Sequence, residues 1–233
     1  MSAIRPEPGL PPGSTGGGGF WVVSEGNGTI GDAGRPINSL NFLIKVDAGG
    51  VIQDVATLPD AVNDGQLRFG FEGVAEYDGK AYVAFQRIWA GTGDTNVRIG
   101  IYDPADGSWE FAYYPLDAVE SPAGGWVGLS DITSLGNGRF LLVERDNQGG
   151  PDARVKRLYE IDLDGAVLGD YTMPVEKTLV RNLMPDLMAP GGLVFEKIEG
   201  SAVTPAGNVW IINDNDGVDD NSGESQLLNL GPL

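Results

Sequence analysis

Short apolar runs alternate with polar, glycine-rich turns from Gly19 onward, and four of these runs share one layout. Each begins at a glycine turn, continues as a strand-like apolar run and ends in polar residues. The four runs are GFWVVSE (19–25), GKAYVAFQR (79–87), GRFLLVERDN (138–147) and GNVWIINDND (207–216). The pattern predicts four equivalent β-strands.

An acidic residue opens a second run before three of these strands. The second runs are EGVAEYDG from Glu72, DITSLGNG from Asp131 and EGSAVTPAG from Glu199. Two further stretches follow, 97–116 and 155–173. Each contains two strand-like runs joined by a turn with an Asp-Gly pair. The repeating unit is therefore four antiparallel strands, and it predicts an all-β fold, a β-propeller of four-stranded antiparallel blades.

The repeat leaves the closure of this propeller open. About three complete units and one partial unit are visible, because the first unit lacks its leading acidic strand. The chain is expected to be either a propeller without its N-terminal part or a small propeller with long blades, and a β-sandwich with coincidental turns is the alternative. Only residues 176–190 depart from the pattern, and they predict a short helix broken near Pro185.

The amino-acid composition limits which partners and which catalytic groups are compatible with this chain. With 15 basic and 33 acidic residues the formal net charge is −18, which disfavours nucleic acid and anionic membranes as partners. The chain has no cysteine and no histidine, so Ser-His-Asp, Cys-His and ordinary zinc sites are excluded within it. Any catalysis must use oxygen groups, Lys or Arg, and a phosphate substrate would need bound cations to reverse the local field.

Residues 1–18 form a Pro/Gly-rich stretch that predicts a flexible lead-in, followed by one β-propeller domain over residues 19–233. No apolar run approaches the ~18 residues needed to span a bilayer, and no signal peptide is recognised. The alternative interpretation of this Pro/Gly-rich stretch is a truncation scar, in which case a lost upstream segment could have carried a targeting signal. The oligomeric state is left open.

Carboxylates should converge if the first strands of the blades line a common axis. Glu72, Asp131 and Glu199 are expected to form a ring, with a second polar set at the ends of the following strands. Carboxylates that lie close together repel each other unless they are protonated, paired with a basic group or bound to a metal ion. Calcium is the metal expected here, because it accepts six to eight oxygen ligands. The predicted metal ligands are Glu25, Glu72, Asp131, Glu144, Glu199, Asp214, Asp216 and Asp219. The alternative is that these acids only fix the packing of the blades.

The stretch NDNDGVDDNSGE (213–224) carries the last three of these acids around Gly217. It does not match an EF-hand, because Ile212 and Gly223 occupy the first and twelfth positions of the loop. A local calcium site formed by Asp214, Asp216 and Asp219 is expected, against the alternative of an ordinary Asp/Asn/Gly turn.

Five segments, in this order, resemble the phytase-like family described by the esterase-like activity of phytase. They are GFWVVSEGN, RFGFEGVAEYDGKAYVAFQ, LSDITSLGNGRFLLVERDN, KIEGSAVTPAGNVWIINDNDGVDD and GESQLLNLG. The resemblance implies a propeller-type fold, a bacterial, exported setting that is extracellular or periplasmic, and hydrolysis of phosphoesters or other esters. It also implies a small-molecule substrate.

Two main hypotheses follow. The first is a calcium-dependent hydrolase of phosphate monoesters or related esters, with Glu72, Asp131, Glu199 and Arg145 as catalytic residues, Arg145 orienting the phosphate and Lys197 assisting. The second is a non-enzymatic, calcium-stabilised propeller that binds partners or serves as a scaffold. Hydrolysis of uncharged lactones or sugar-acid esters is a third possibility, which the net charge favours mildly.

Overall fold

The computed structural model describes residues 2–5, 19–89, 94–189, 192, 194–215 and 225–232. Within these ranges the chain forms four antiparallel sheets, in which consecutive strands are hydrogen-bonded neighbours. The first sheet contains β1 (Ser2–Arg5), β2 (Gly19–Ser24), β3 (Phe42–Asp47) and β4 (Ile52–Thr57). The second contains β5 (Phe71–Tyr77), β6 (Lys80–Phe85), β7 (Val97–Asp103) and β8 (Ser108–Tyr114).

The other two sheets repeat this layout. The third contains β9 (Val127–Gly136), β10 (Arg139–Asp146), β11 (Lys156–Asp162) and β12 (Lys177–Asn182). The fourth contains β13 (Ile198–Val203), β14 (Asn208–Asn213) and β15 (Leu227–Pro232). Helices are short where the structure describes the chain: α1 (Asp60–Asn63), a 3-10 turn (Gly150–Asp152) and α2 (Met184–Leu187).

The predicted repeat is confirmed as an all-β chain built from mostly four-stranded antiparallel sheets. The four runs that begin at a glycine turn are β2, β6, β10 and β14, which are the second strands of the four sheets. The three acidic runs are the first strands β5, β9 and β13, and β1 supplies the first strand that the sequence pattern had not revealed for the first sheet.

The short helix predicted over residues 176–190 is wrong in its first half. Residues 177–182 form β12 and pair with β11, and α2 begins only at Met184. Pro185 lies in the first turn of α2, where its missing N–H has no helical partner to lose, so it starts this helix instead of breaking it.

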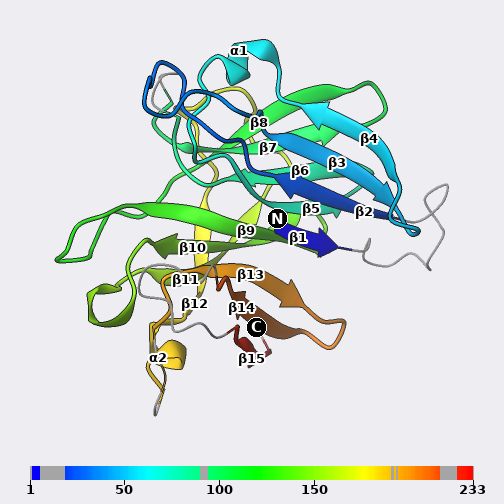
Figure 1. Cartoon of the computed structure of the whole chain (residues 1–233). Helices are drawn as coiled ribbons and strands as arrows, with labels where there is room; N and C mark the ends of the chain where they lie inside the picture. Colours follow the sequence, from blue (N-terminus) through cyan, green and yellow to red (C-terminus); the bar gives the residue numbers. More distant parts are fainter. Residues whose placement is uncertain are drawn as a thin grey trace.

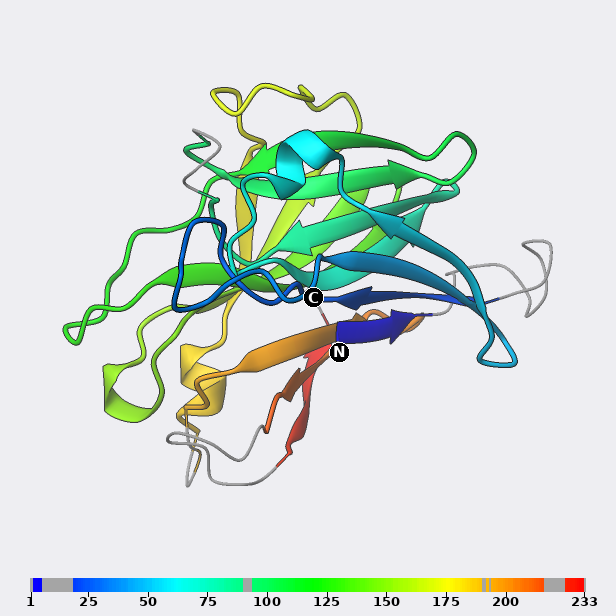
Figure 2. The ribbon, with the colours of Figure 1, turned by 45° about the horizontal axis from the view of Figure 1, so that its top comes forward.

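The first strands of the four sheets are neighbours in space. Strand β5 contacts β9, β9 contacts β13, and β1 contacts both β5 and β13. The sheets spread outward from this region in both views of the ribbon (Figures 1 and 2). Because the strands of each sheet run antiparallel, the second strands β2, β6, β10 and β14 end where the first strands begin, at one common end of the sheets.

The hydrophobic core lies between consecutive sheets. A large cluster joins the first three sheets, and a smaller one packs the third sheet against the fourth. Trp21, Tyr82 and Phe140 are buried, and Trp89 is only 1% exposed. This packing fixes the relative positions of the strand ends that carry the polar residues.

Candidate active site

Three glutamates from different sheets meet at the common end of the sheets. Glu25 directly follows β2, Glu72 is the second residue of β5, and Glu199 is the second residue of β13. We refer to Glu25, Glu72 and Glu199 as the carboxylate trio. Electrostatic coupling within the trio is direct, because both Glu25 and Glu199 raise the pKa of Glu72.

Irregularities in strand pairing place two members of the trio. The pairing of β5 with β6 shifts between Phe71 and Gly73, which leaves Glu72 as the extra residue. The pairing of β13 with β14 shifts in the same way around Glu199. Such bulges re-aim a side chain next to functional sites. In the pairing of β9 with β10, Val143 lies opposite Asp131 and Glu144 lies opposite Leu129. The extra residue in β9 is therefore Ser130, and not Asp131.

Glu72 is a buried carboxyl group with a strongly perturbed pKa. The residue is 7% exposed, and loss of hydration upon burial raises its pKa well above the usual value. The charges of Glu199 and Glu25 add to this effect, whereas the guanidinium of Arg145 opposes it. Burial and the two neighbouring carboxylates therefore favour the protonated form of Glu72, which is the form that can act as an acid.

Glu25 titrates close to neutral pH. The protein atoms around it remove enough water to raise its pKa to about 7, and Glu199 contributes to the shift. The amide of Gly70, which donates to Oε1 of Glu25 at 3.2 Å, lowers the pKa. The Glu25 side chain nevertheless keeps an exposed surface, so solvent screens it more than it screens Glu72.

Arg145 neutralises the third member of the trio. Its side chain is 3% exposed, and Nη2 forms an ion pair with Oε1 of Glu199. Its Nε donates to the hydroxyl of Ser130 at 2.9 Å, so the guanidinium is held between β9 and β13. The sequence predicts that Arg145 orients a phosphate, but in the structure these protein partners already engage two sides of the guanidinium.

Two further arginines lie beside the trio, stacked on aromatic rings. The guanidinium carbons of Arg68 and Arg87 each lie 4.6 Å from the ring centroid of Phe69. Arg87 also lies 5.0 Å from the ring of Trp126, and Arg145 lies 5.3 Å from that same ring. We refer to Arg68, Phe69, Arg87, Trp126 and Arg145 as the arginine–aromatic row.

Arg68 and Arg87 repel each other. Burial lowers the pKa of Arg87, and the positive charge of Arg68 lowers it further. Across the described part of the chain, neither side chain forms an ion pair with an acidic residue. Sequence reasoning missed both arginines, although RFGFEG places Arg68 four residues before Glu72 and AFQR places Arg87 just after β6.

A buried asparagine fixes the loops that carry the site. Asn41 is fully buried, and its Oδ1 accepts from the amides of Gly26 and Phe71, both at 2.9 Å. It thereby joins the residue after Glu25 to the residue before Glu72. A Cβ on Gly70 would lie 1.9 Å from this same Oδ1, so only glycine fits there. Asn41 thus positions two members of the trio relative to each other.

Asp131 lies between the first strands. It is fully buried, and its Oδ2 accepts from the amide of Ser201 at 2.7 Å and from the hydroxyl of Ser201 at 2.9 Å. A Cβ on Gly73 would lie 2.7 Å from Asp131 Oδ1. Asp131 therefore joins β9 to β13 and packs against β5, and its place in the predicted ring is taken by Ser130.

Glu144 belongs to a different polar network, because alternate residues of β10 face opposite sides of the sheet. Its Oε2 accepts from the hydroxyl of Tyr114 at 2.6 Å and from Lys177 Nζ at 2.8 Å. Its Oε1 accepts from the amide of Asp117 at 2.8 Å. Burial raises the pKa of Glu144, and these three donors oppose the rise.

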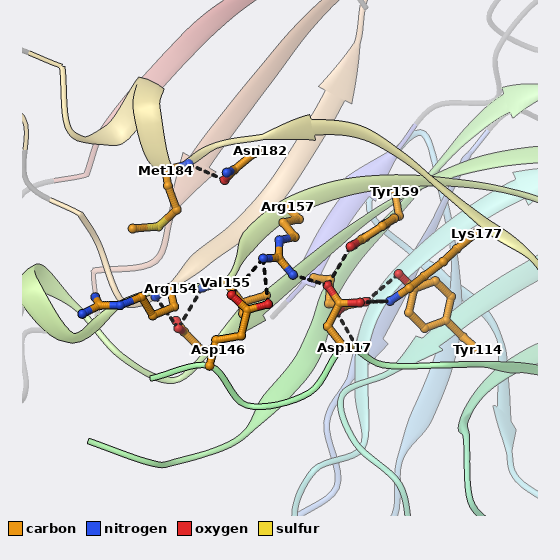
Figure 3. A network of polar contacts seen from close by, with 12 residues as sticks. Tyr114, Asp117, Asp146, Arg154, Val155, Arg157, Tyr159, Lys177, Asn182 and Met184 are labelled. Carbon is orange, nitrogen blue, oxygen red and sulfur yellow. Dashed lines mark hydrogen bonds and ion pairs between the residues drawn. The ribbon is translucent and has the colours of Figure 1, made fainter. Parts of the chain in front are cut away.

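Asp117 is the second acid of this network. It pairs with Lys177 at 2.8 Å, accepts from the hydroxyl of Tyr159 at 2.6 Å and pairs with Arg157 (Figure 3). Burial favours the protonated form of Asp117, but these donors outweigh it and lower its pKa to about 2. The network joins the end of β8 to β10, β11 and β12, and so ties the second sheet to the third.

The predicted ligands near the C-terminus do not join the trio in the described residues. Asp214 is exposed, and its amide donates to the carbonyl of Lys197 at 2.9 Å. Asp216 and Asp219 lie outside the described residues. No group of three or more acidic side chains that could hold a metal ion occurs in the described ranges. The trio as it stands therefore does not fit a calcium site.

The chain is thus an all-β protein in which carboxylates and arginines lie together at one end of the sheets. Residues 14–217 match the family described as "Phytase-like: Esterase-like activity of phytase". The chain belongs to this family, which confirms the resemblance of its motifs and makes it a phytase-like or esterase-like hydrolase. Comparison with curated proteins gives no significant match. None of the helices in the described ranges is long and apolar enough to cross a membrane.

Proposed function

We propose that the chain hydrolyses phosphate monoesters or related small-molecule esters at the carboxylate trio. The observation that carries this proposal is the convergence of Glu25, Glu72 and Glu199 from three sheets, with Arg145 bound to one of them. Structural acids normally pair with bases, whereas this group sets protonated and ionised carboxyls side by side. Membership in the phytase-like family supports the same reaction class.

Each glutamate has a separate task in the proposed reaction. A water molecule attacks the phosphorus or the ester carbon and gives its proton to ionised Glu25, whose pKa of about 7 suits a base. The bond to the leaving oxygen breaks, and that oxygen takes the proton of Glu72. Glu199 holds Arg145 in place through their ion pair. The products are an alcohol and the corresponding acid.

Replacing Glu72 tests this assignment. Glu72→Gln removes the transferable proton, so kcat for nitrophenyl phosphate and nitrophenyl acetate should fall by about 10²–10⁴-fold. The melting temperature at pH 7 should not fall, because glutamine has nearly the size of glutamate and carries no charge for Glu25 and Glu199 to repel. The control is Glu110→Gln on the exposed side of β8, which should leave kcat unchanged. Unchanged turnover in Glu72→Gln would exclude the trio as the catalytic centre.

Calcium is a separate proposal, since no step above passes through a metal. We propose that it binds near the end of β14, where Asp214 lies, with Asp216 and Asp219 as the other ligands. Melting in EDTA and in added calcium tests this, because a ligand that binds only the folded state raises the melting temperature. The Asp214→Asn variant should lose that increase. A melting temperature that does not respond to calcium in the wild type would end the proposal.

For the fold we propose a propeller in which the four sheets are blades. The contacts of β1, β5, β9 and β13 in cyclic order support it, since first strands line the axis of a propeller. An experimental structure with β1 separated from β13 would contradict closure. The extracellular or periplasmic setting stays a prediction, to be checked by fractionating the native host.

A further inference from the structure

The arginine–aromatic row contains two cationic groups that form no ion pair with an acidic residue in the described ranges. Arg68 is exposed and Arg87 is half-buried, and both lie over Phe69. In a chain of net charge −18, two adjacent guanidinium groups without an acidic partner are unusual. Arg145, the third arginine of the row, differs because its guanidinium forms an ion pair with Glu199 and donates a hydrogen bond to Ser130. An anionic ligand would relieve the repulsion between Arg68 and Arg87.

The backbone around the row is held in place at every aromatic position. The indole of buried Trp89 donates to the carbonyl of Phe69 at 2.9 Å. The amide of Trp126 donates to Oδ1 of Asn147 at 2.7 Å. The rings of Phe69 and Trp126 lie 5.5 Å apart, centroid to centroid, and both side chains are half-exposed. The rings are therefore a fixed support for the guanidinium groups.

Stacking on such a support restricts a guanidinium without using its hydrogen-bond donors. The guanidinium groups of Arg68 and Arg87 lie over aromatic rings, and neither donates a hydrogen bond to another residue of the described ranges. Two guanidinium edges fit the several oxygens of a phosphate group, because each can donate two parallel hydrogen bonds. A neutral ester offers no charge for them to balance.

We infer that Arg68 and Arg87, held by Phe69 and Trp126, bind a dianionic phosphate group. The inference deepens the proposed function, since it makes the phosphate monoester the substrate class that this hydrolase selects. Arg145 lies 5.3 Å from the Trp126 ring and pairs with Glu199, so the phosphate would be bound beside the carboxylate trio. The row thus makes the electrostatic potential at this site positive, although the net charge of the whole chain is negative.

Binding of inorganic phosphate tests the inference without requiring turnover. Titration calorimetry at low salt should show that Arg87→Gln and Arg68→Gln each weaken phosphate binding by roughly tenfold to a hundredfold, as expected for hydrogen bonds to a charged group. Arg87→Lys should give an intermediate loss, because it keeps the charge but loses the planar fork. The matched control is Arg139→Gln, since Arg139 begins β10 at the opposite end of the sheet and pairs with Glu160.

A pair of substrates provides the second readout. Arg87→Gln should raise KM for nitrophenyl phosphate by a similar factor and leave KM for neutral nitrophenyl acetate unchanged. Phosphate binding by the wild type without any turnover would overturn the proposed hydrolase but keep this site. Equal phosphate affinity in wild type and Arg87→Gln, or equal changes for both substrates, would overturn the site and leave the hydrolase standing. Melting curves of each variant confirm that it is folded.

Discussion

At the scale of single residues, Glu25 and Glu72 oppose stability at neutral pH, because the pKa of each carboxyl is raised in the folded chain. A carboxyl group whose pKa is higher in the folded state than in the unfolded state binds more protons when folded. Its contribution to the free energy of unfolding is therefore present at low pH and is lost as the pH rises. For Glu25 the window runs from its unperturbed pKa of 4.5 to its folded pKa of about 7. Asp117, with a pKa of about 2, titrates below this window.

Glu25→Gln should remove this pH dependence. Glutamine does not titrate, so the melting temperature of the variant should fall less between pH 4.5 and pH 7 than that of the wild type. Melting curves at four or five pH values measure the difference. Glu110→Gln, on the exposed side of β8, serves as the control and should follow the wild type. Parallel curves for Glu25→Gln and wild type would contradict a raised pKa at Glu25.

At the scale of strands, the site depends on how closely β5 approaches β9. A Cβ on Gly73 would lie 2.7 Å from the amide nitrogen of Ile132 and 2.8 Å from the Cα of Asp131. These are backbone atoms, so they cannot move aside cheaply. Glycine at this position lets β5 pack tightly while the adjacent bulge turns Glu72 toward Glu25 and Glu199.

Gly73→Ala should separate these strands. Overpacking of this kind lowers the free energy of unfolding by about 1–3 kcal/mol, and the shift of Glu72 should also reduce kcat. Urea unfolding and turnover of nitrophenyl phosphate measure the two effects. Gly34→Ala, in an exposed loop, should change stability by less than about 0.5 kcal/mol. If Gly73→Ala matched this control in both assays, the tight approach would have no role.

At the scale of the whole molecule, the polar network of Glu144 and Asp117 fastens the second sheet to the third. Glu144 is fully buried, and each of its oxygens has a donor from the protein. Such an acid needs no metal ion to balance it, since Lys177 contributes the opposite charge. Its role in the structure is to hold sheets together.

Glu144→Gln should therefore lower stability equally with and without calcium. The loss of a charged partner for Lys177 should reduce the free energy of unfolding by roughly 1–3 kcal/mol. Melting in EDTA and in calcium separates the two roles, because a metal ligand would lose the calcium-dependent increase while a network residue would not. Glu110→Gln again provides the exposed control. A calcium response that vanished only in Glu144→Gln would identify Glu144 as a ligand.

The amino-acid sequence was sufficient to predict most of the strands, although not β1 or β12. Its glycine turns and apolar runs predicted β2, β6, β10 and β14, because strand formation depends on local pattern and turn chemistry. The acidic runs likewise predicted that Glu72 and Glu199 come together, since equivalent strands of repeated units end at the same place. The order of the motifs also indicated the phytase-like family, and residues 14–217 match that family.

Which side chains face one another depends on the packing of the sheets in three dimensions. A shift of one residue in the pairing of β9 with β10 puts Ser130 where the sequence predicts Asp131, and pattern alone cannot reveal such a bulge. Alternation along β10 sends Glu144 away from Arg145, into contact with Lys177. Arg68 and Arg87 lie 19 residues apart in the chain and meet over one ring of Phe69 through the packing of β5 and β6. Long-range packing of this kind is absent from any local pattern, which is why the arginines were found only in the folded chain.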